Sequence, residues 1–180
     1  MTGAEIDHIL DTMSVIVDTR EQDTERARRR YMRFGCPYER GVLDFGDYTY
    51  QAVLSDGTSV YNTAERIIPD VAVERKMSLD ELAMCFTSDR KRFTAEMERA
   101  KAHGSRMYLL TENTTWEKLL RGKYKSKFHP NAFKASVSTF MVRYGVQLIF
   151  CQEETSGELI REILYRELKE RLVNWEKTDM

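Results

Sequence analysis

The sequence predicts an α/β domain with a mixed central β-sheet flanked by helices on both sides. Short apolar runs of strand length alternate along the chain with longer segments of helical periodicity. Capping residues and glycines mark the ends of the helical segments. With 180 residues, 42% of them hydrophobic and 32% charged, the chain has an ordinary globular composition and can bury its own core.

The first half of the chain reads as strands with one helix between them. Apolar runs bounded by turn residues predict the strands, and the Asp56-Gly57 pair predicts a hairpin turn. The expected elements are a buried strand over Ser14–Thr19, a helix over Asp23–Phe34, hairpin strands over Gly41–Leu54 and Ser59–Asn62, and a strand over Val71–Lys76.

Capping boxes and Pro130 place the helices of the second half. The expected elements are a helix from Ser78, a helix over Asp89–His103, a strand over Arg106–Thr111, a helix capped at Thr114–Glu117, a helix over Pro130–Tyr144, a strand over Val146–Phe150 and a last helix capped at Thr155–Glu158. We therefore expect an N-terminal extension over residues 1–12, the main domain over 13–150, and an amphipathic helix over 151–180 that packs on the same domain.

Composition excludes several classes of function. A net charge of -1 means that any contact with nucleic acid depends on local basic patches rather than on overall charge. No apolar run is long enough for a membrane span, and the polar N-terminus lacks the apolar core of a signal peptide. The three widely spaced cysteines (Cys36, Cys85 and Cys151) do not form a zinc pattern and suit a reducing cytoplasm.

Charged residues interrupt a buried strand in the segment "VAVERKMSLD". Side chains two positions apart share a strand face, so Glu74 and Lys76 point one way and Arg75 the other. Burying ionised groups costs several kcal/mol unless they are paired or bind a metal. A salt bridge at the end of a strand is the simpler interpretation of the same residues.

Further polar residues follow other predicted strands. Asp18, Arg20 and Glu21 end the first strand, Asp47 lies in "DFGDY", and Asp80 falls in the first turn after Lys76. Carboxylates that converge can hold a hard divalent cation through oxygen, and a nearby lysine can act on water or phosphate.

Four motifs resemble, in order, those of the XPF-type nuclease domain of structure-specific DNA endonucleases. They are "VDTRE" (Val17–Glu21), "GDY" (Gly46–Tyr48), "VERKMSLD" (Val73–Asp80) and "SDRKRFTAE" (Ser88–Glu96). The third contains the ERK-x-x-x-D signature of that family in full. The resemblance is close over residues 14–112 and looser to about 150, and it implies a restriction-endonuclease-like fold.

The resemblance also implies roles for individual residues. Asp47 and Glu74 would be the central Mg²⁺ ligands, with the backbone carbonyl of Arg75 a third and with Mn²⁺ able to substitute. Asp18 and Asp80 would be further carboxylates that bind the ion directly or through water. Lys76 would orient or activate the attacking water. The implied catalytic set is completed by Arg20, Arg75 and Asp80; Arg20 and Arg92 would hold phosphate or active-site carboxylates, or form purely structural ion pairs.

Two basic segments are candidates for binding DNA. In the first predicted helix, four arginines recur at i, i+3, i+4 and i+7 from Arg26, which places them on one face. The segment "RGKYKSKFHPNAFK" combines basic residues with aromatic ones, as suits phosphate contact with base stacking. Solvated surface is the alternative for both. The expected DNA contacts are Arg29, Arg30, Arg33, Arg92, Arg121, Lys123, Tyr124, Lys125 and Lys127.

The resemblance implies a metal-dependent endonuclease that hydrolyses phosphodiester bonds at branched or flap DNA in repair, recombination or replication. The 180 residues match neither the helix-hairpin-helix nor the helicase-like regions of larger family members, which suggests a stand-alone bacterial or phage form. Family members dimerise, so a homodimer is expected. Two alternatives stay open: a non-catalytic DNA-binding or partner subunit with this fold, and an unrelated α/β interaction protein whose ERK is a surface ion pair.

Overall fold

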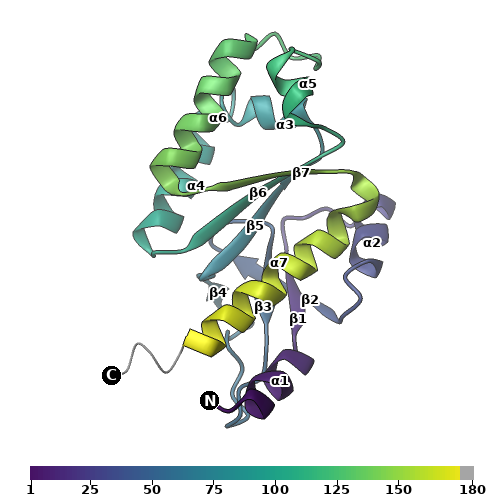
Figure 1. The fold of residues 1–180 in the computed structure, drawn as a ribbon, viewed down its shortest axis with the longest axis vertical. Helices are drawn as coiled ribbons and strands as arrows, with labels where there is room; N and C mark the ends of the chain where they lie inside the picture. Colours follow the sequence, from purple (N-terminus) through teal and green to yellow (C-terminus); the bar gives the residue numbers. More distant parts are fainter. Residues whose placement is uncertain (175–180) are drawn as a thin grey trace. The chain divides into compact units, whose positions relative to one another are not determined.

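The structure is a computed structural model that describes residues 1–174, and it divides into two compact units. Unit 1 contains Met1–Ile68 together with the segment that begins at Gly157. Unit 2 contains Pro69–Ser156. The order of the elements along the chain can be followed in Figure 1.

Unit 1 holds a mixed sheet with the strand order β4-β2-β1-β3. Its central strand β1 (Ser14–Asp18) runs parallel to β2 (Tyr38–Leu43) and antiparallel to β3 (Tyr48–Gln51). The short edge strand β4 (Arg66–Ile67) pairs in parallel with β2. The apolar run of β1 is buried throughout, which explains why it lacks the alternation of a half-exposed strand.

The helices of unit 1 are α1 (Gly3–Asp11), α2 (Glu25–Met32) and the part of α7 (Glu153–Asn174) that follows Gly157. This part of α7 buries Ile160, Leu164, Leu168 and Leu172, the apolar row predicted from its spacing. It also approaches α2 closely, because a Cβ at Gly157 would lie 2.3 Å from the carbonyl oxygen of Arg30. The close approach therefore requires glycine at this position.

Unit 2 contains a parallel sheet in the order β5-β6-β7, formed by Val71–Lys76, Arg106–Glu112 and Gln147–Cys151. Its helices are α3 (Leu79–Met84), α4 (Arg90–Ala102), α5 (Trp116–Leu120) and α6 (Pro130–Tyr144). In Figure 1, α4 and α6 run side by side. Their rings Phe93 and Phe140 stack at a centroid distance of 5.5 Å, and Phe86 from the end of α3 packs edge-on to both.

The predicted fold class is confirmed, because parallel and antiparallel strand pairs are combined with flanking helices. Two local predictions were wrong. The segment 41–54 is not one strand: it turns at Gly46, where φ is 75°, so that β2 and β3 lie on opposite sides of β1. The hairpin after it is reduced to a single bridge between Val53 and Ser59.

The N-terminal part of the chain contains more helix than predicted. Residues 3–11, expected as an extension, form α1, whose capping box joins Thr2 and Glu5. Helix α7 begins at Glu153, before the predicted cap at Thr155. Within residues 1–174, no helix is both long enough and apolar enough to span a membrane. The predicted helix residues 175–180 lie outside the described part of the chain.

Candidate active site

The carboxyl end of β5 carries a buried ion pair. Glu74 and Lys76 are 5% and 8% exposed, and the Nζ of Lys76 donates a hydrogen bond to the carboxylate of Glu74. The two side chains share a strand face, as predicted. Both side chains act electrostatically on Cys85, and burial raises the pKa of the Cys85 thiol to about 12. The surroundings of the ion pair are therefore poorly solvated. A charged pair kept in such a place is typical of functional sites.

Arg75 forms a second ion pair. Its guanidinium donates two hydrogen bonds to Glu112, from Nε at 3.0 Å and from Nη2 at 2.6 Å. Glu112 is completely buried at the end of β6, so this pair joins the two parallel strands. Glu112 was not predicted from the sequence as a site residue, although its position after the apolar run "RMYLLT" was the available signal.

A buried hydroxyl lies beside Lys76 in the sheet. Thr111 is opposite Lys76 in the β5–β6 register and is fully buried. Within residues 1–174, its Oγ1 has no hydrogen-bond partner. Buried polar groups without partners are rare in folded proteins, so Thr111 also marks this end of the sheet as unusual. Nothing in the sequence distinguished it from an ordinary strand threonine.

Asp18 ends β1 and is held by four hydrogen bonds. Its Oδ1 accepts from the backbone N–H and the Nε of Arg20, at 2.8 and 2.6 Å. Its Oδ2 accepts from the Nη2 of Arg20 at 3.2 Å and from the backbone N–H of Leu43 at 2.8 Å. A carboxylate has about four acceptor positions, so this arrangement leaves Asp18 little capacity to bind a metal directly.

Asp47 follows the turn between β2 and β3. Its carbonyl oxygen accepts a hydrogen bond of 2.8 Å from the backbone N–H of Asp18, so the two motif positions are tied together through the main chain of unit 1. The side chain of Asp47 is half-buried. The positive φ of Gly46 allows the turn that places Asp47 there.

Two motif residues and Arg30 form a structural cluster. The Tyr48 hydroxyl donates to Glu21 at 2.7 Å and accepts from Arg30 at 2.8 Å. Arg30 is only 3% exposed. This burial is at odds with the predicted DNA contact of Arg30, because helical spacing cannot show which part of a wide helix face is covered by other elements.

The other predicted arginines are more accessible. Arg29 is exposed and pairs with Glu25, and Arg33 is exposed at the end of α2. Arg92, at the start of α4, pairs with Asp89 at 3.1 Å with 73% of its side chain exposed. This hydrogen bond, followed by more distant carboxylates that include Glu74, raises the pKa of Arg92. All three can reach a phosphate without breaking a buried contact.

Asp80 contacts the backbone of the basic segment. Its Oδ1 accepts hydrogen bonds from the N–H groups of Lys125 and Ser126, at 2.8 and 2.6 Å. Asp80 thus fixes the position of the segment 121–128, here called the basic loop. The lysines at 123, 125 and 127 are exposed, whereas Tyr124 and Phe128 are half-buried.

The carboxylates present are hard oxygen donors, as Mg²⁺ requires. Within residues 1–174, no three His, Cys, Asp or Glu side chains are grouped so that they could hold an ion by themselves. Mg²⁺ is usually bound through one or two carboxylates together with water and substrate phosphate, so the donor set fits Mg²⁺ better than a zinc-type cage.

Comparison with known families gives one match, to the ERCC4 domain, over residues 17–163. The chain belongs to the ERCC4 domain family. The match begins in β1 and ends in α7, so this ERCC4 domain includes the strand-end residues of both units. No relative was found among curated protein sequences.

Two solved structures resemble this ERCC4 domain. XPF from Aeropyrum pernix matches with a TM-score of 0.58 and 18% identity, covering 86% of this chain and 61% of that one. XPF from the same organism in complex with DNA matches with a TM-score of 0.56 and 20% identity, covering 86% and 64%. The chain therefore spans less than two thirds of the length of these relatives, and at such identity the likeness establishes the fold.

Proposed function

We propose that this chain is a magnesium-dependent DNA endonuclease that hydrolyses phosphodiester bonds at branched or flap DNA. The observation that carries the proposal is the buried Glu74–Lys76 pair at the carboxyl end of β5, in a chain of the ERCC4 domain family. Members of the ERCC4 domain family are nucleases. A Glu-x-Lys sequence at the end of a strand supplies both an oxygen that can bind a metal and a cation that can contact the phosphate.

Asp47 and Glu74 are the carboxylates that would hold Mg²⁺, and Mn²⁺ could substitute for it. When bound, the ion supplies positive charge where negative charge develops on the phosphate. Of the two roles expected for Asp18, direct binding of the ion is disfavoured, because its oxygens are engaged by Arg20 and Leu43. Asp18 holds the guanidinium of Arg20, 60% of whose side chain is exposed, ready for a phosphate.

Lys76 is the residue that acts on the nucleophile. Its ammonium group is kept at the strand end by Glu74, and it can donate a hydrogen bond to a water or to a phosphate oxygen. Arg75 contributes through its pair with Glu112, which fixes the end of β5 against β6. Rigid strands hold reacting groups in place better than loops do.

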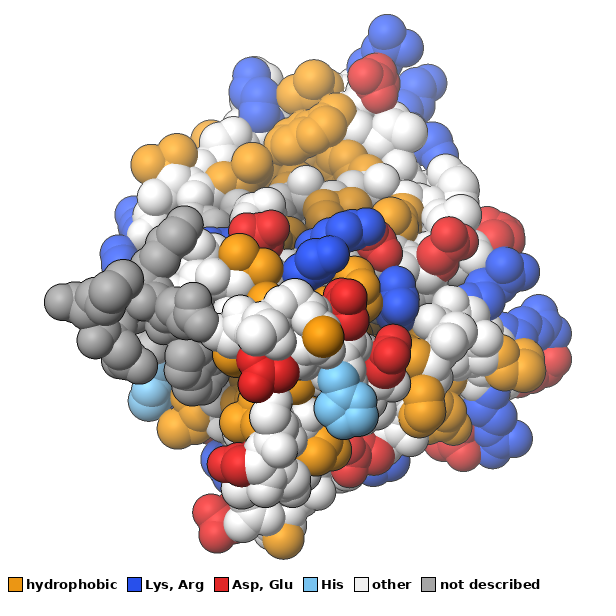
Figure 2. Space-filling model, turned by 60° about the horizontal axis from the view of Figure 1, so that its bottom comes forward, with side chains coloured by type: hydrophobic (Ala, Val, Ile, Leu, Met, Phe, Trp, Pro, Cys, Tyr) orange, Lys and Arg blue, Asp and Glu red, His pale blue; other side chains and the backbone are white. Residues whose placement is uncertain are grey.

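DNA would be bound by the exposed cations. One of the structural relatives, XPF from Aeropyrum pernix, is a complex with DNA, which supports the same ligand class here. Figure 2 shows basic and acidic side chains interspersed on the face that it draws. The net charge of the whole chain is -1. Binding then depends on local groups, of which Arg29, Arg33, Arg92 and the basic loop are the candidates.

A non-catalytic DNA-binding or partner subunit is the second candidate function. The engagement of Asp18 favours it, because four hydrogen bonds occupy the carboxylate oxygens that a metal ligand would need. We also propose a homodimer and a role in a bacterial cytoplasm or a phage-infected cell. In α6, Phe133, Val137, Phe140 and Tyr144 are buried, but Val142 is 88% exposed. A monomer mass in light scattering at micromolar concentration would contradict the dimer.

The test of the proposed function is a cleavage assay with Mg²⁺ on flap, fork, four-way and linear DNAs of the same sequence. An endonuclease of this type cuts the branched substrates, loses activity in EDTA and regains it on addition of Mg²⁺ or Mn²⁺. Binding of the same DNAs without cleavage under any of these conditions would favour the non-catalytic subunit.

A further inference from the structure

Unit 2 contains a cavity of about 440 Å³ at the carboxyl ends of two parallel strands. Ser78, Leu79 and Asp80 follow the end of β5 on one side, and Asn113 and Thr114 follow the end of β6. In open α/β sheets, ligands bind in the crevice outside the carboxyl ends of the strands. The volume lies within the roughly 300–1,000 Å³ of small-ligand sites.

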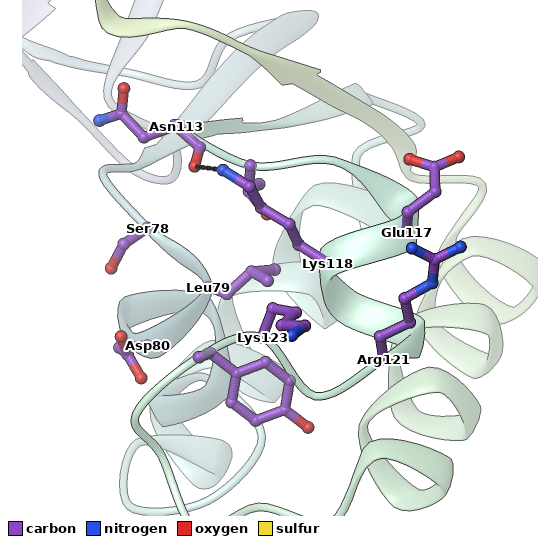
Figure 3. A pocket seen from close by; sticks show the side chains of 10 residues that line it. Ser78, Leu79, Asp80, Asn113, Glu117, Lys118, Arg121 and Lys123 are labelled. Atoms are coloured by element: carbon purple, nitrogen blue, oxygen red, sulfur yellow. Dashed lines mark hydrogen bonds between the residues drawn. The ribbon is translucent and has the colours of Figure 1, made fainter.

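The remaining lining residues come from α5 and from the first part of the basic loop. They supply three cations, one carboxylate and one aromatic ring: Lys118, Arg121, Lys123, Glu117 and Tyr124. In Figure 3, Lys118 and Arg121 lie across the cavity from Ser78 and Asp80, with Lys123 between them. The Nζ of Lys118 donates to the carbonyl oxygen of Asn113 at 3.1 Å, which fixes its ammonium group at the wall.

The basic loop is held against this cavity by specific contacts. Asp80 accepts the N–H groups of Lys125 and Ser126, and the Tyr124 hydroxyl donates to the carbonyl oxygen of Phe128 at 2.8 Å. The Tyr124 ring also packs edge-on with Phe133, at a centroid distance of 5.3 Å. The aromatic wall is therefore already positioned in the structure, which lowers the entropic cost of binding a ring against it.

We propose that this cavity accepts one unpaired nucleotide of a DNA single strand. The base would pack against Tyr124, and the cations of the wall would attract the phosphate. A paired base cannot enter such a cavity unless it is extruded from the helix, which costs energy that an unpaired base does not need. This inference rests on the proposed function and adds a physical reason why the protein would prefer substrates with unpaired strands.

The experiment measures binding by the full chain in EDTA, so that cleavage plays no part. Fluorescence anisotropy compares a labelled oligothymidylate with a blunt duplex of equal length. Tyr124→Leu should weaken binding of the oligothymidylate about five-fold or more and leave the duplex unchanged. Tyr124→Phe, which keeps the ring but loses the bond to Phe128, should bind the oligothymidylate like the wild type.

The basic loop offers a matched pair of lysines. Lys123 lines the cavity, whereas Lys127, four residues along the same exposed loop, does not. Lys123→Ala should weaken binding of the oligothymidylate more than binding of the duplex, and Lys127→Ala should weaken binding of both equally. Thymidine monophosphate and unlabelled oligothymidylate serve as competitors of the labelled oligothymidylate. If the cavity binds a nucleotide within a strand, thymidine monophosphate should compete far less well, per nucleotide, than the unlabelled oligothymidylate.

Several results would overturn the inference. Equal effects of Tyr124→Leu on both probes, or a loss with Tyr124→Phe as large as with Tyr124→Leu, would show that Tyr124 only supports the loop. Equal competition by thymidine monophosphate would rule out the strand as the occupant. If the wild type binds neither probe, the inference fails; a flap DNA titrated in the same assay then shows whether the proposed function fails with it.

Discussion

The carboxylate of Glu112 accepts both ends of the Arg75 guanidinium and is inaccessible to solvent, while only 11% of the Arg75 side chain is exposed. This pair lies on the strand face opposite Glu74 and Lys76. The four charged residues at the carboxyl ends of β5 and β6 thus divide into one pair that joins the strands and one pair that can serve chemistry. The side chain of Arg75, a residue predicted as part of the catalytic set, belongs to the pair that joins the strands.

Glu112→Gln tests the structural role of the Arg75 pair. The substitution keeps the shape of the side chain but removes the negative charge of the buried pair, so the free energy of unfolding should fall by about 3 kcal/mol. Asp89→Asn is the control, because it breaks the exposed pair with Arg92 and should cost about 1 kcal/mol or less. Urea denaturation of both variants measures the difference, and equal losses would contradict the assignment.

Thr111→Val tests the unpartnered hydroxyl beside Lys76. A buried hydroxyl without a partner costs about 1–3 kcal/mol, so the valine variant should be more stable than the wild type by about 1 kcal/mol. Thr12→Val is the opposite case, because the Thr12 hydroxyl donates to Ile9 and accepts from Val53, and its removal should destabilise the protein. A stability loss in Thr111→Val would show that its hydroxyl is hydrogen-bonded in solution.

At the scale of elements, the basic loop was predicted from the sequence as a DNA-binding segment, and the structure shows which contacts hold it in place. Its lysines at 123, 125 and 127 alternate with half-buried residues, because Tyr124 bonds the Phe128 carbonyl and Asp80 binds the backbone. The loop is therefore a fixed edge that presents three ammonium groups, and each can neutralise a phosphate.

Changing Lys123, Lys125 and Lys127 together to Ala should weaken binding to every DNA shape. Each lost phosphate contact should reduce the slope of log affinity against log salt by about 0.7–0.9, so the slope should fall by about two in total. Anisotropy titrations at several salt concentrations measure it. An unchanged slope and affinity would show that the loop is solvated surface and would direct attention to Arg29 and Arg33.

Strand β3 and its neighbour Tyr61 make unit 1 sensitive to alkali. Burial raises the pKa of Tyr48 and Tyr50 above the ordinary value of 10.0, and raises that of Tyr61 to about 12. Because these pKa values are higher in the folded state than in the unfolded one, their contribution to stability is complete below about pH 10 and decreases at higher pH. The contribution of Tyr61 is lost as the pH rises through about 12.

The expected result is cooperative unfolding above about pH 10, with phenolate absorbance at these tyrosines appearing together with the loss of circular dichroism. Between about pH 10 and 12 the free energy of unfolding should fall less steeply with pH in Tyr61→Phe than in the wild type. The difference in slope should correspond to about one proton. Phenolate absorbance that develops near pH 10 while the circular dichroism stays native would mean that these rings are accessible to solvent.

At the scale of the whole molecule, periodicity was sufficient to predict the strands β1, β5 and β6 and the boundaries of α6. It did not predict α1, although the Thr2–Glu5 capping box and the spacing of Ile6, Ile9 and Leu10 were the available signals. The shared face of Glu74 and Lys76 followed from strand geometry alone.

Other contacts depend on tertiary packing that spacing does not encode. The partner of Arg75 required the strand register that brings β6 beside β5. The burial of Arg30 required knowledge of which face of α2 is covered. Asp18 was correctly placed at a strand end, but its four hydrogen bonds involve Leu43, which lies 25 residues away in sequence.

The central claim is that Asp47 and Glu74 are metal ligands of a nuclease, and the most direct test is the rate of single-turnover cleavage by Asp47→Asn and Glu74→Gln. With Mg²⁺ and saturating branched DNA, each variant should cleave at least about a hundred-fold more slowly than the wild type, because each removes charge that stabilises the transition state. Both should still bind the same DNA in EDTA, which controls for folding. Cleavage at the wild-type rate by either variant would contradict the account.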